Sequence, residues 1–101
     1  MKVIYVASPY SGDVTQNTYL ARMYCRYVVD KGYVPFASHL LLPQFMSESK
    51  ERDLAFEMNV AFLEKCDELW VFGEKISKGM ALEIRQAEKL NKKICFINEI
   101  V

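Results

Sequence analysis

The chain has no long apolar run, no excess of charge of one sign and no paired set of cysteines. No stretch of its 101 residues approaches the roughly 20 consecutive apolar residues that span a membrane, and the N-terminus lacks the layout of a signal peptide. Basic and acidic residues number 13 each, so the formal net charge is zero and a nonspecific nucleic-acid surface is not expected. These absences predict a cytoplasmic protein with no membrane and no nucleic-acid partner.

Residues that could form disulfides or bind a metal through sulfur or imidazole are scarce as well. The three cysteines, Cys25, Cys66 and Cys95, lie far apart without a C-x-x-C pattern, which argues against a disulfide framework and against a zinc site. Each lies in an apolar context, so we expect buried, unreactive thiols. His39 is the only histidine. We therefore expect neither a metal nor a cofactor.

The remaining composition is that of an ordinary globular domain. Hydrophobic residues make up 51%, aromatic residues 13% and charged residues 26% of the chain. Its length is close to the common size of one domain and is sufficient for a hydrophobic core. The sequence contains no linker, repeat or low-complexity segment, so we expect residues 1–101 to form a single domain.

Apolar, β-branched runs alternate with amphipathic segments along the chain. The run from Val3 to Ala7 is continuously apolar, which is typical of a strand covered on both faces. Asp13 and Gln16 resemble a capping box that begins a helix, and Gly32 is a C-terminal stop. Residues 38–49 are expected to form a longer loop or an irregular helix. The expected strands are residues 3–7, 33–37, 68–72 and 93–97, and the expected helices are residues 13–31, 50–65 and 78–90.

This alternation of strands and helices indicates a parallel sheet with right-handed crossovers. We predict a three-layer α/β domain of the Rossmann or flavodoxin-like kind, with about four parallel strands flanked by helices. Ligands of such sheets bind outside the carboxyl ends of the strands, at the switch point. The loops at that edge are residues 8–12, Ser38 with His39, and residues 73–79, so their polar groups should converge on one crevice.

The third expected helix combines a possible anion site with a carboxylate. Ser77 and Gly79 lie where the helix begins, where free backbone N–H groups attract anions and glycine permits close approach. Glu83, one turn later, shares an otherwise apolar stripe with Met80 and Ala87 and has no basic residue one turn away. Such a carboxylate either reaches a cavity or finds a donor elsewhere in the fold. Helical spacing alone does not favour either of these two environments for Glu83.

Further polar side chains lie on or beside apolar surfaces. Asn59 lies on the apolar face of the second helix, Asn17 opens the apolar stripe of the first, and Tyr5 lies within the first strand. Each has an ordinary structural alternative, because a buried amide can fasten a loop and a strand tyrosine can be part of the core. His39 follows the second strand, but a lone histidine is more often a structural hydrogen-bonding group than a catalyst.

The first helix also has a second, mixed face. Aromatic, methionine and arginine residues gather there, a combination that suits a protein interface. We therefore expect a homo-oligomer, most simply a homodimer, formed through Tyr19, Arg22, Met23, Arg26 and Tyr27.

Several groups of residues together resemble a known family. They are Tyr5-Val-Ala-Ser8-Pro-Tyr10-Ser-Gly12, Gly32-Tyr-Val-Pro, His39, Cys66-Asp67-Glu-Leu-Trp70-Val-Phe-Gly73, Ser77-Lys-Gly79-Met80-Ala-Leu-Glu83 and Lys93-Ile94. In this order they resemble the nucleoside 2-deoxyribosyltransferase-like superfamily over nearly the whole chain. Within that superfamily the chain looks most similar to the uncharacterised DUF4406 group.

The resemblance implies cleavage of the N-glycosidic bond of deoxynucleosides or their 5′-monophosphates. Glu83 matches the family's helix nucleophile, and Tyr5 matches a strand tyrosine beside it. Ser8 and Ser77 match serines that contact phosphate in the relatives acting on monophosphates. The chemistry is plausible, because a carboxylate can stabilise or capture the positive charge that develops at the anomeric carbon. The candidate substrate-binding residues are Ser8, Tyr10, Gly12, Asn17, His39, Ser77, Gly79 and Met80.

The chain departs from the family pattern at two positions. Asn59 stands where the family has a second acidic residue, and Tyr10 stands where the monophosphate hydrolases have a basic one. With Glu83 as nucleophile and Tyr5 and Asn59 as supporting polar groups, the sequence predicts a nucleoside or nucleotide N-glycosidase or deoxyribosyltransferase. Its partner would be a small nucleoside or nucleotide.

Two other functions stay open at this point. A nucleotide-binding module of the same fold would bind its ligand without turnover, and the neutral Asn59 favours it. A purely structural partner protein would bind no small molecule and would be indifferent to Ser77→Ala.

Overall fold

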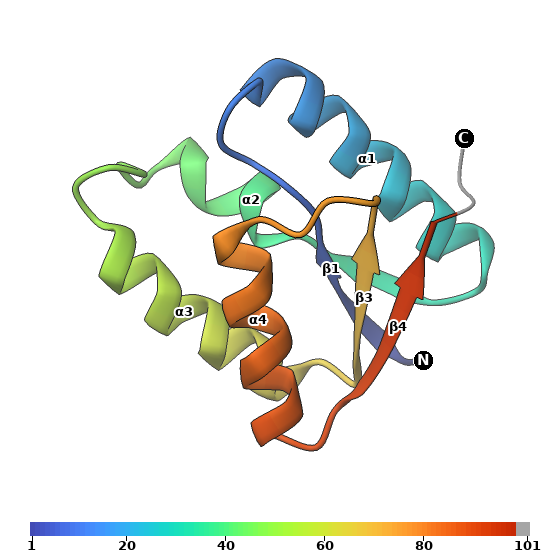
Figure 1. The fold of residues 1–101 in the computed structure, drawn as a ribbon. Coiled ribbons are helices and arrows are strands. Elements are labelled where there is room, and N and C mark those ends of the chain that lie inside the picture. Colours follow the sequence, from blue (N-terminus) through green and yellow to red (C-terminus); the bar gives the residue numbers. More distant parts are fainter. Residues whose placement is uncertain (99–101) are drawn as a thin grey trace.

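The computed structural model describes residues 1–98, which form an α/β fold built on a four-stranded parallel sheet (Figure 1). The strands are β1 (Val3–Ala7), β2 (Val34–Phe36), β3 (Glu68–Phe72) and β4 (Lys93–Ile97), in the spatial order β2-β1-β3-β4. The helices are α1 (Val14–Asp30), α2 (Ser38–Leu41), α3 (Arg52–Lys65) and α4 (Lys78–Lys89), with a 3-10 turn, η1 (Leu42–Gln44). The predicted fold class is confirmed.

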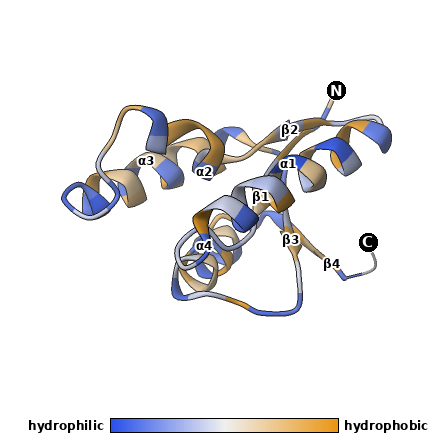
Figure 2. Cartoon of the chain, turned by 90° about the horizontal axis from the view of Figure 1, so that it is seen from above, coloured by the Kyte–Doolittle hydropathy of each residue, from blue (hydrophilic) through white to orange (hydrophobic). Residues whose placement is uncertain are grey.

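The central strands are buried on both faces, as their unbroken apolar sequences indicate. Alternate side chains of β1 and β3 enter two separate cores. Tyr5 and Val71 belong to the core shared with α3 and α4, whereas Val6 and Trp70 belong to the core shared with α1. Helices therefore cover both faces of the sheet, α3 and α4 on one and α1 on the other (Figure 1). Their ribbons carry hydrophobic and hydrophilic residues together, as amphipathic helices do (Figure 2).

Local signals set most of the helix ends. The Asp13 carboxylate accepts a hydrogen bond from the Gln16 N–H at 3.1 Å and so caps α1. After α1, Gly32 has a φ of 91°, a conformation that glycine adopts without strain. Strand β2 is shorter than expected and contains Pro35, which is tolerated because β2 is an edge strand. The segment from residue 38 onward forms α2 and η1, in keeping with the expected irregular helix.

A buried acidic residue lies at the opposite end of the sheet from the expected crevice. Glu68 begins β3 and accepts hydrogen bonds from the Trp70 indole N–H and the Lys2 ammonium, both at 2.9 Å. These donors, Trp70 first, hold the pKa of Glu68 below its ordinary value although burial opposes them. The single tryptophan is thereby fixed within the core shared with α1.

The cysteines differ in how deeply they are buried. All three are free, and Cys66 is buried, whereas Cys25 and Cys95 are only partly buried. Burial raises the pKa of the Cys25 and Cys66 thiols to about 11. Within residues 1–98 no helix is long and apolar enough to cross a membrane. The same residues contain no group of histidine, cysteine or acidic side chains that could hold a metal ion.

Candidate active site

A cavity of about 550 Å³ lies beyond the carboxyl end of β1, between the α2–η1 segment, α3 and the first turns of α4. Its position is the edge of the sheet where ligands of parallel α/β domains bind. Every strand-end loop predicted to form the crevice contributes to it. It is lined by Ser8, Tyr10, Ser11, Ser38, His39, Leu42, Pro43, Met46, Ser47, Glu48, Arg52, Ala55, Phe56, Asn59, Ser77, Lys78, Gly79, Met80, Leu82 and Glu83.

Glu83 and Tyr5 form the shortest polar contact in the cavity wall. The Tyr5 hydroxyl donates a hydrogen bond of 2.5 Å to Glu83 Oε2, and the same hydroxyl lies 3.4 Å from Ser38 Oγ. Tyr5 is fully buried within β1, so its ring holds the hydroxyl in place beneath α4. The described residues offer Glu83 no cationic partner within salt-bridge distance. Both alternatives left by the sequence apply, because the carboxylate lines the cavity and also accepts a hydrogen bond from Tyr5 in another element of the fold.

The environment of Glu83 makes its carboxyl easy to protonate. The residue is only partly buried because it lines the cavity, whereas its carboxyl group is largely desolvated. Burial raises the pKa of Glu83 to about 7, and the hydrogen bond from Tyr5 lowers it against this trend. The pKa of Tyr5 is raised well above 10 by its own burial and by the carboxylate beside it. A carboxyl that titrates near neutral pH is common at catalytic sites.

Ser8 and His39 join the loops that follow β1 and β2. Ser8 Oγ lies 2.8 Å from His39 Nε2, and both residues line the cavity. Burial lowers the pKa of His39 to about 4, so the imidazole is neutral near pH 7. A neutral ring holds Ser8 in place and adds no charge to the cavity.

The start of α4 forms another part of the wall. Ser77 Oγ caps the helix by accepting a hydrogen bond from the Met80 N–H at 3.2 Å. The Met80 side chain itself is buried in the core, so its contribution to the cavity comes from the turn around it. Two cations, Lys78 and Arg52, also line the cavity, and Arg52 lies 3.7 Å from Glu48. A helix start with nearby cations suits an anionic group such as a phosphate.

Asn59 lies on α3, in the wall that also contains Ala55 and Phe56. Its Oδ1 is buried, and no residue from 1 to 98 donates a hydrogen bond to it. Buried amide oxygens are normally paired, so this atom requires an explanation.

Two of the predicted substrate-binding residues lie outside this cavity. The Asn17 amide nitrogen donates to the backbone oxygens of Tyr10 at 3.1 Å and Ser11 at 3.0 Å, so it holds the first loop in shape. Gly12 has a φ of 97° and serves the turn into α1. The structure brings the other predicted residues together: Ser8, Tyr10, His39, Asn59, Ser77, Gly79, Met80 and Glu83 line the cavity, and Tyr5 reaches it through its bond to Glu83.

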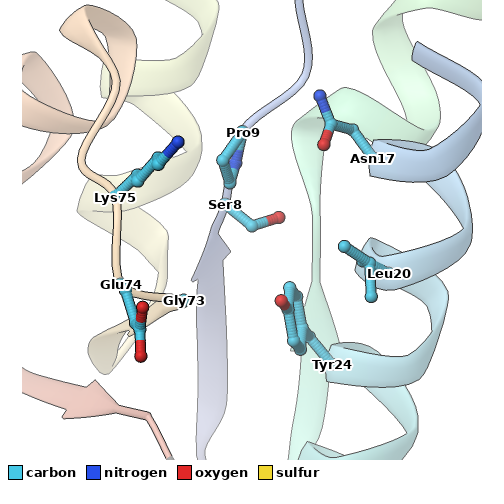
Figure 3. A pocket seen from close by; sticks show the side chains of 8 residues that line it. All are labelled: Ser8, Pro9, Asn17, Leu20, Tyr24, Gly73, Glu74 and Lys75. Atoms are coloured by element: carbon cyan, nitrogen blue, oxygen red, sulfur yellow. The ribbon is translucent and has the colours of Figure 1, made fainter. Parts of the chain in front are cut away.

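A second cavity of about 270 Å³ opens on the α1 side of the sheet (Figure 3). Asn17, Leu20 and Tyr24 of α1 line one side of it, and the loop after β3 lines the other. Ser8 is the residue that the two cavities share.

Sequence reasoning missed the apolar part of the main cavity wall. Leu42, Pro43 and Met46 come from the segment that was expected to be a loop or irregular helix, and Phe56 comes from α3. The signal that could have indicated this wall is the density of apolar residues in segment 38–49, because a solvent-exposed loop does not need so many of them.

Comparison with known proteins gives the family. The sequence of residues 2–97 matches DUF7768, a domain of unknown function. The chain belongs to the DUF7768 family. The DUF4406 grouping expected from the sequence is thus not confirmed. No curated protein matches this DUF7768 chain.

Solved structures share the fold of this DUF7768 domain. The Clostridium botulinum CMP N-glycosidase BcmB is 20% identical, with a TM-score of 0.68 over 96% of this chain and 71% of that one. A 2-deoxyribosyltransferase from Bacillus psychrosaccharolyticus is 21% identical, with a TM-score of 0.67 over 98% of this chain and 76% of that one. The Leishmania mexicana 2-deoxyribosyltransferase is 19% identical, with a TM-score of 0.66 over 99% of this chain and 66% of that one. At these identities the likeness concerns the fold.

Proposed function

We propose that this protein cleaves the N-glycosidic bond of a nucleoside or nucleoside 5′-monophosphate, with Glu83 as the nucleophile. The observation that carries the proposal is the Glu83 carboxylate in the cavity, bonded by the Tyr5 hydroxyl at 2.5 Å and free of a cationic partner among the described residues. The shared fold supports it, because the neighbours include an enzyme named for cleaving CMP and two named 2-deoxyribosyltransferases.

The reaction follows from the charge that develops on the sugar. The bond between the anomeric carbon and the base nitrogen breaks, and its electron pair leaves with the base. The Glu83 carboxylate stabilises the resulting positive carbon or forms a covalent bond to it. Water or a second base then attacks the anomeric carbon, and Glu83 leaves as a carboxylate. The proton that the attacking group loses balances the one that the departed base takes up. The Tyr5 hydroxyl holds the carboxylate in place throughout.

The remaining cavity residues have roles in binding under this proposal. A 5′-phosphate would lie at the start of α4, near Ser77 and Gly79, with Ser8 and the two cations Lys78 and Arg52 around it. Met80 helps to form the sugar pocket, whereas Tyr10 and His39 provide polar contacts. Gly12 and Asn17 shape the first loop.

The test is release of free base from a panel of nucleosides and nucleoside 5′-monophosphates. Glu83→Ala should abolish release, because no other carboxylate of the cavity adjoins Tyr5. The matched control is Glu88→Ala, which removes an exposed carboxylate from the same helix outside the cavity. Full activity in Glu83→Ala would reject the nucleophile.

The alternative function is a nucleotide-binding module that does not turn its ligand over. The observation that favours it is Asn59, a neutral amide among the cavity side chains. Calorimetry with the same panel separates the two functions, since binding without any release of base selects the module.

We also propose that the protein is a cytoplasmic homodimer formed through the outer face of α1. Tyr19 is 56% exposed, and Arg22 and Arg26 are exposed beside it. Met23 and Tyr27 are only partly exposed, and the Tyr27 ring packs edge-on against Phe72 with centroids 6.0 Å apart. The proposed interface therefore centres on Tyr19.

A further inference from the structure

Ser38 is a buried polar residue to which the proposed reaction assigns no role. It is the first residue of α2 and is only 4% exposed, yet it lines the main cavity. Ser8 and Glu68, which are also buried, have hydrogen-bond partners that account for their polar atoms. The Ser38 hydroxyl lies 3.4 Å from the Tyr5 hydroxyl, and no other side chain of residues 1–98 bonds it.

The direction of this contact follows from the number of protons. Tyr5 has a single hydroxyl proton, and the bond of 2.5 Å to Glu83 uses it. The Tyr5 oxygen can therefore only accept from Ser38, so the Ser38 hydroxyl is the donor while Glu83 is ionised. The three groups form a chain of hydrogen bonds that runs from Ser38 through Tyr5 to the carboxylate.

A donor behind the phenol strengthens the bond in front of it. Hydrogen bonds in a chain polarise one another, because a hydroxyl that accepts on one side becomes a better donor on the other. The pKa of Tyr5 has the corresponding sign, since the bond from Ser38 lowers it against the rise that burial and Glu83 cause. At 3.4 Å the Ser38 contact is longer than an ordinary hydroxyl bond, so its effect on Glu83 should be smaller than that of Tyr5.

The fold fixes the place of Ser38 relative to β1. Strand β2 pairs with β1 so that Phe36 lies opposite Tyr5, and Ser38 follows two residues later. The next residue, His39, contacts Ser8 at 2.8 Å. The first turn of α2 is therefore joined to β1 and the loop after it at two points.

We propose that Ser38 is a positioning residue of the active site, whose hydroxyl donates to Tyr5 and so directs the Tyr5 proton onto the ionised Glu83. The inference rests on the proposed function, because it names a further residue on which the Glu83 nucleophile depends.

Other titratable and charged groups surround Tyr5 and Glu83. They are His39 of α2, Arg52 of α3, Cys66 at the end of α3, Lys78 of α4, Glu48 before α3 and Tyr10 after β1. Burial lowers the pKa of His39 to about 4 and raises that of Cys66 to about 11, so neither titrates near pH 7. Because Ser38→Ala retains all of these groups, a change in the titration of Glu83 comes from the lost hydroxyl.

The experiment titrates the Glu83 carboxyl by ¹³C NMR in the full chain, labelled at the glutamate carboxyl carbons and free of ligand. The spectrum of Glu83→Gln assigns the signal. We expect Ser38→Ala to move the midpoint upward by about 0.3 pH units, since neighbouring bonds strengthen a hydrogen bond by roughly a tenth to a third. Ser38→Thr keeps a hydroxyl, so its midpoint should stay close to that of the wild type. Thermal unfolding of each variant shows that it is folded.

Two comparisons separate the chain of hydrogen bonds from a general effect of the change. Ser11→Ala removes a hydroxyl from the same cavity that does not bond Tyr5, so it should leave the midpoint unchanged. In Tyr5→Phe, the additional change Ser38→Ala should cause no further shift, because Ser38 acts only through the phenol. A structural role of Ser38 would shift the midpoint equally with and without the Tyr5 hydroxyl.

The outcomes separate this inference from the proposed function. An unchanged midpoint in Ser38→Ala, or an equal shift in Ser38→Thr, overturns the role of the hydroxyl, and an equal shift in Tyr5→Phe overturns the route through Tyr5. The titration needs no substrate, so it decides these points even if the wild type releases no base. If base is released, the rising limb of kcat/KM for Ser38→Ala should shift with the midpoint, which lowers kcat/KM about twofold below the limb.

Discussion

At the scale of single residues, the proposed chemistry depends on the contact between Tyr5 and Glu83. The two side chains are 78 positions apart in sequence, yet their oxygens lie 2.5 Å apart. Burial raises the pKa of Glu83 to about 7, and the phenol limits that rise. Because a nucleophilic carboxylate must be ionised, the rate of base release should increase with pH through about 7.

Tyr5→Phe should move this pH dependence to higher values. Loss of the hydroxyl removes the hydrogen bond that favours the ionised carboxylate, so the pKa of Glu83 rises further. The measurement is kcat/KM for base release as a function of pH, and the rising limb should shift upward. Tyr24→Phe serves as a control, because Tyr24 lines only the cavity on the α1 side. If kcat/KM of Tyr5→Phe rose over the same pH range as that of the wild type, the hydroxyl of Tyr5 would not control the pKa of Glu83.

Glu83→Gln should stabilise the protein at high pH. The carboxyl has a pKa of about 7 in the folded protein and 4.5 as an unperturbed group, so the folded state binds the extra proton. The stability that protonation provides is complete below 4.5 and is lost as the pH rises through about 7. At about pH 8 we expect Glu83→Gln to raise the free energy of unfolding by roughly 2 kcal/mol, less than the full shift implies because the residue is partly exposed.

Urea unfolding of both proteins at about pH 8 and about pH 5 measures the effect. The difference between them should shrink at the lower pH, since wild-type Glu83 is then protonated. His39 opposes stability at low pH equally in both proteins and cancels from the comparison. A difference independent of pH would show that the carboxyl is not desolvated.

Periodicity identified Glu83 because one carboxylate on an apolar stripe is unusual. Periodicity did not identify Tyr5 as the hydrogen-bond partner of Glu83, because contacts between distant elements do not affect the local sequence pattern. Asn17 shows the reverse problem: a polar residue one turn from a binding loop looks like a ligand contact, but its amide nitrogen is used by the Tyr10 and Ser11 backbone.

At the scale of elements, Ser77 at the start of α4 has a structural role and, under the proposed function, a binding role. The hydroxyl caps the helix through the Met80 N–H. Ser77→Ala should therefore cost about 1 kcal/mol of stability and also weaken binding of a 5′-monophosphate.

Ser77→Asp separates these roles, because aspartate also caps a helix but places a negative charge at its start. We expect stability close to that of the wild type, retained binding of nucleosides and at least about tenfold weaker binding of their 5′-monophosphates. Calorimetry with matched nucleoside and nucleotide pairs measures this. Equal affinity loss for both ligands would place the phosphate elsewhere.

The helices and strands with strong periodicity were predictable, and the segment after β2 was not. Strand β4 begins and ends where its apolar run indicated, and α4 ends within one residue of its expected end. The α2 helix has only four residues and is followed directly by a 3-10 turn. Elements as short as α2 and η1 depend on packing against the rest of the fold, and the spacing of apolar residues in the sequence does not reveal that packing.

At the scale of the whole molecule, the alternation of strands and helices sufficed to predict the layers and the parallel sheet. The strand order β2-β1-β3-β4 places the switch point between β1 and β3, where Ser8 and Gly73 follow the strands. The proposed interface on α1 brings Arg22 and Arg26 of each copy beside the exposed Tyr19, so the apolar contacts of that interface would have to offset the repulsion between like charges.

Tyr19→Lys should convert the proposed dimer into a monomer. The two added ammonium groups would join Arg22 and Arg26 of both copies at a symmetric interface centred on this position, and like charges there are unfavourable. Sedimentation velocity of wild type and variant at the same concentration measures the change. A control on the opposite side, Leu54→Lys on α3, should leave the dimer intact. Monomeric wild-type protein would remove the proposal.

Trp70 lies on the sheet face away from the main cavity, its indole tied to Glu68 and its ring packed against Tyr33 with centroids 5.7 Å apart. The only tryptophan of the chain thus lies outside the lining of both cavities. We therefore expect its emission to report unfolding of the core shared with α1 and to change little when the main cavity fills, so that ligand binding has to be followed with a different probe.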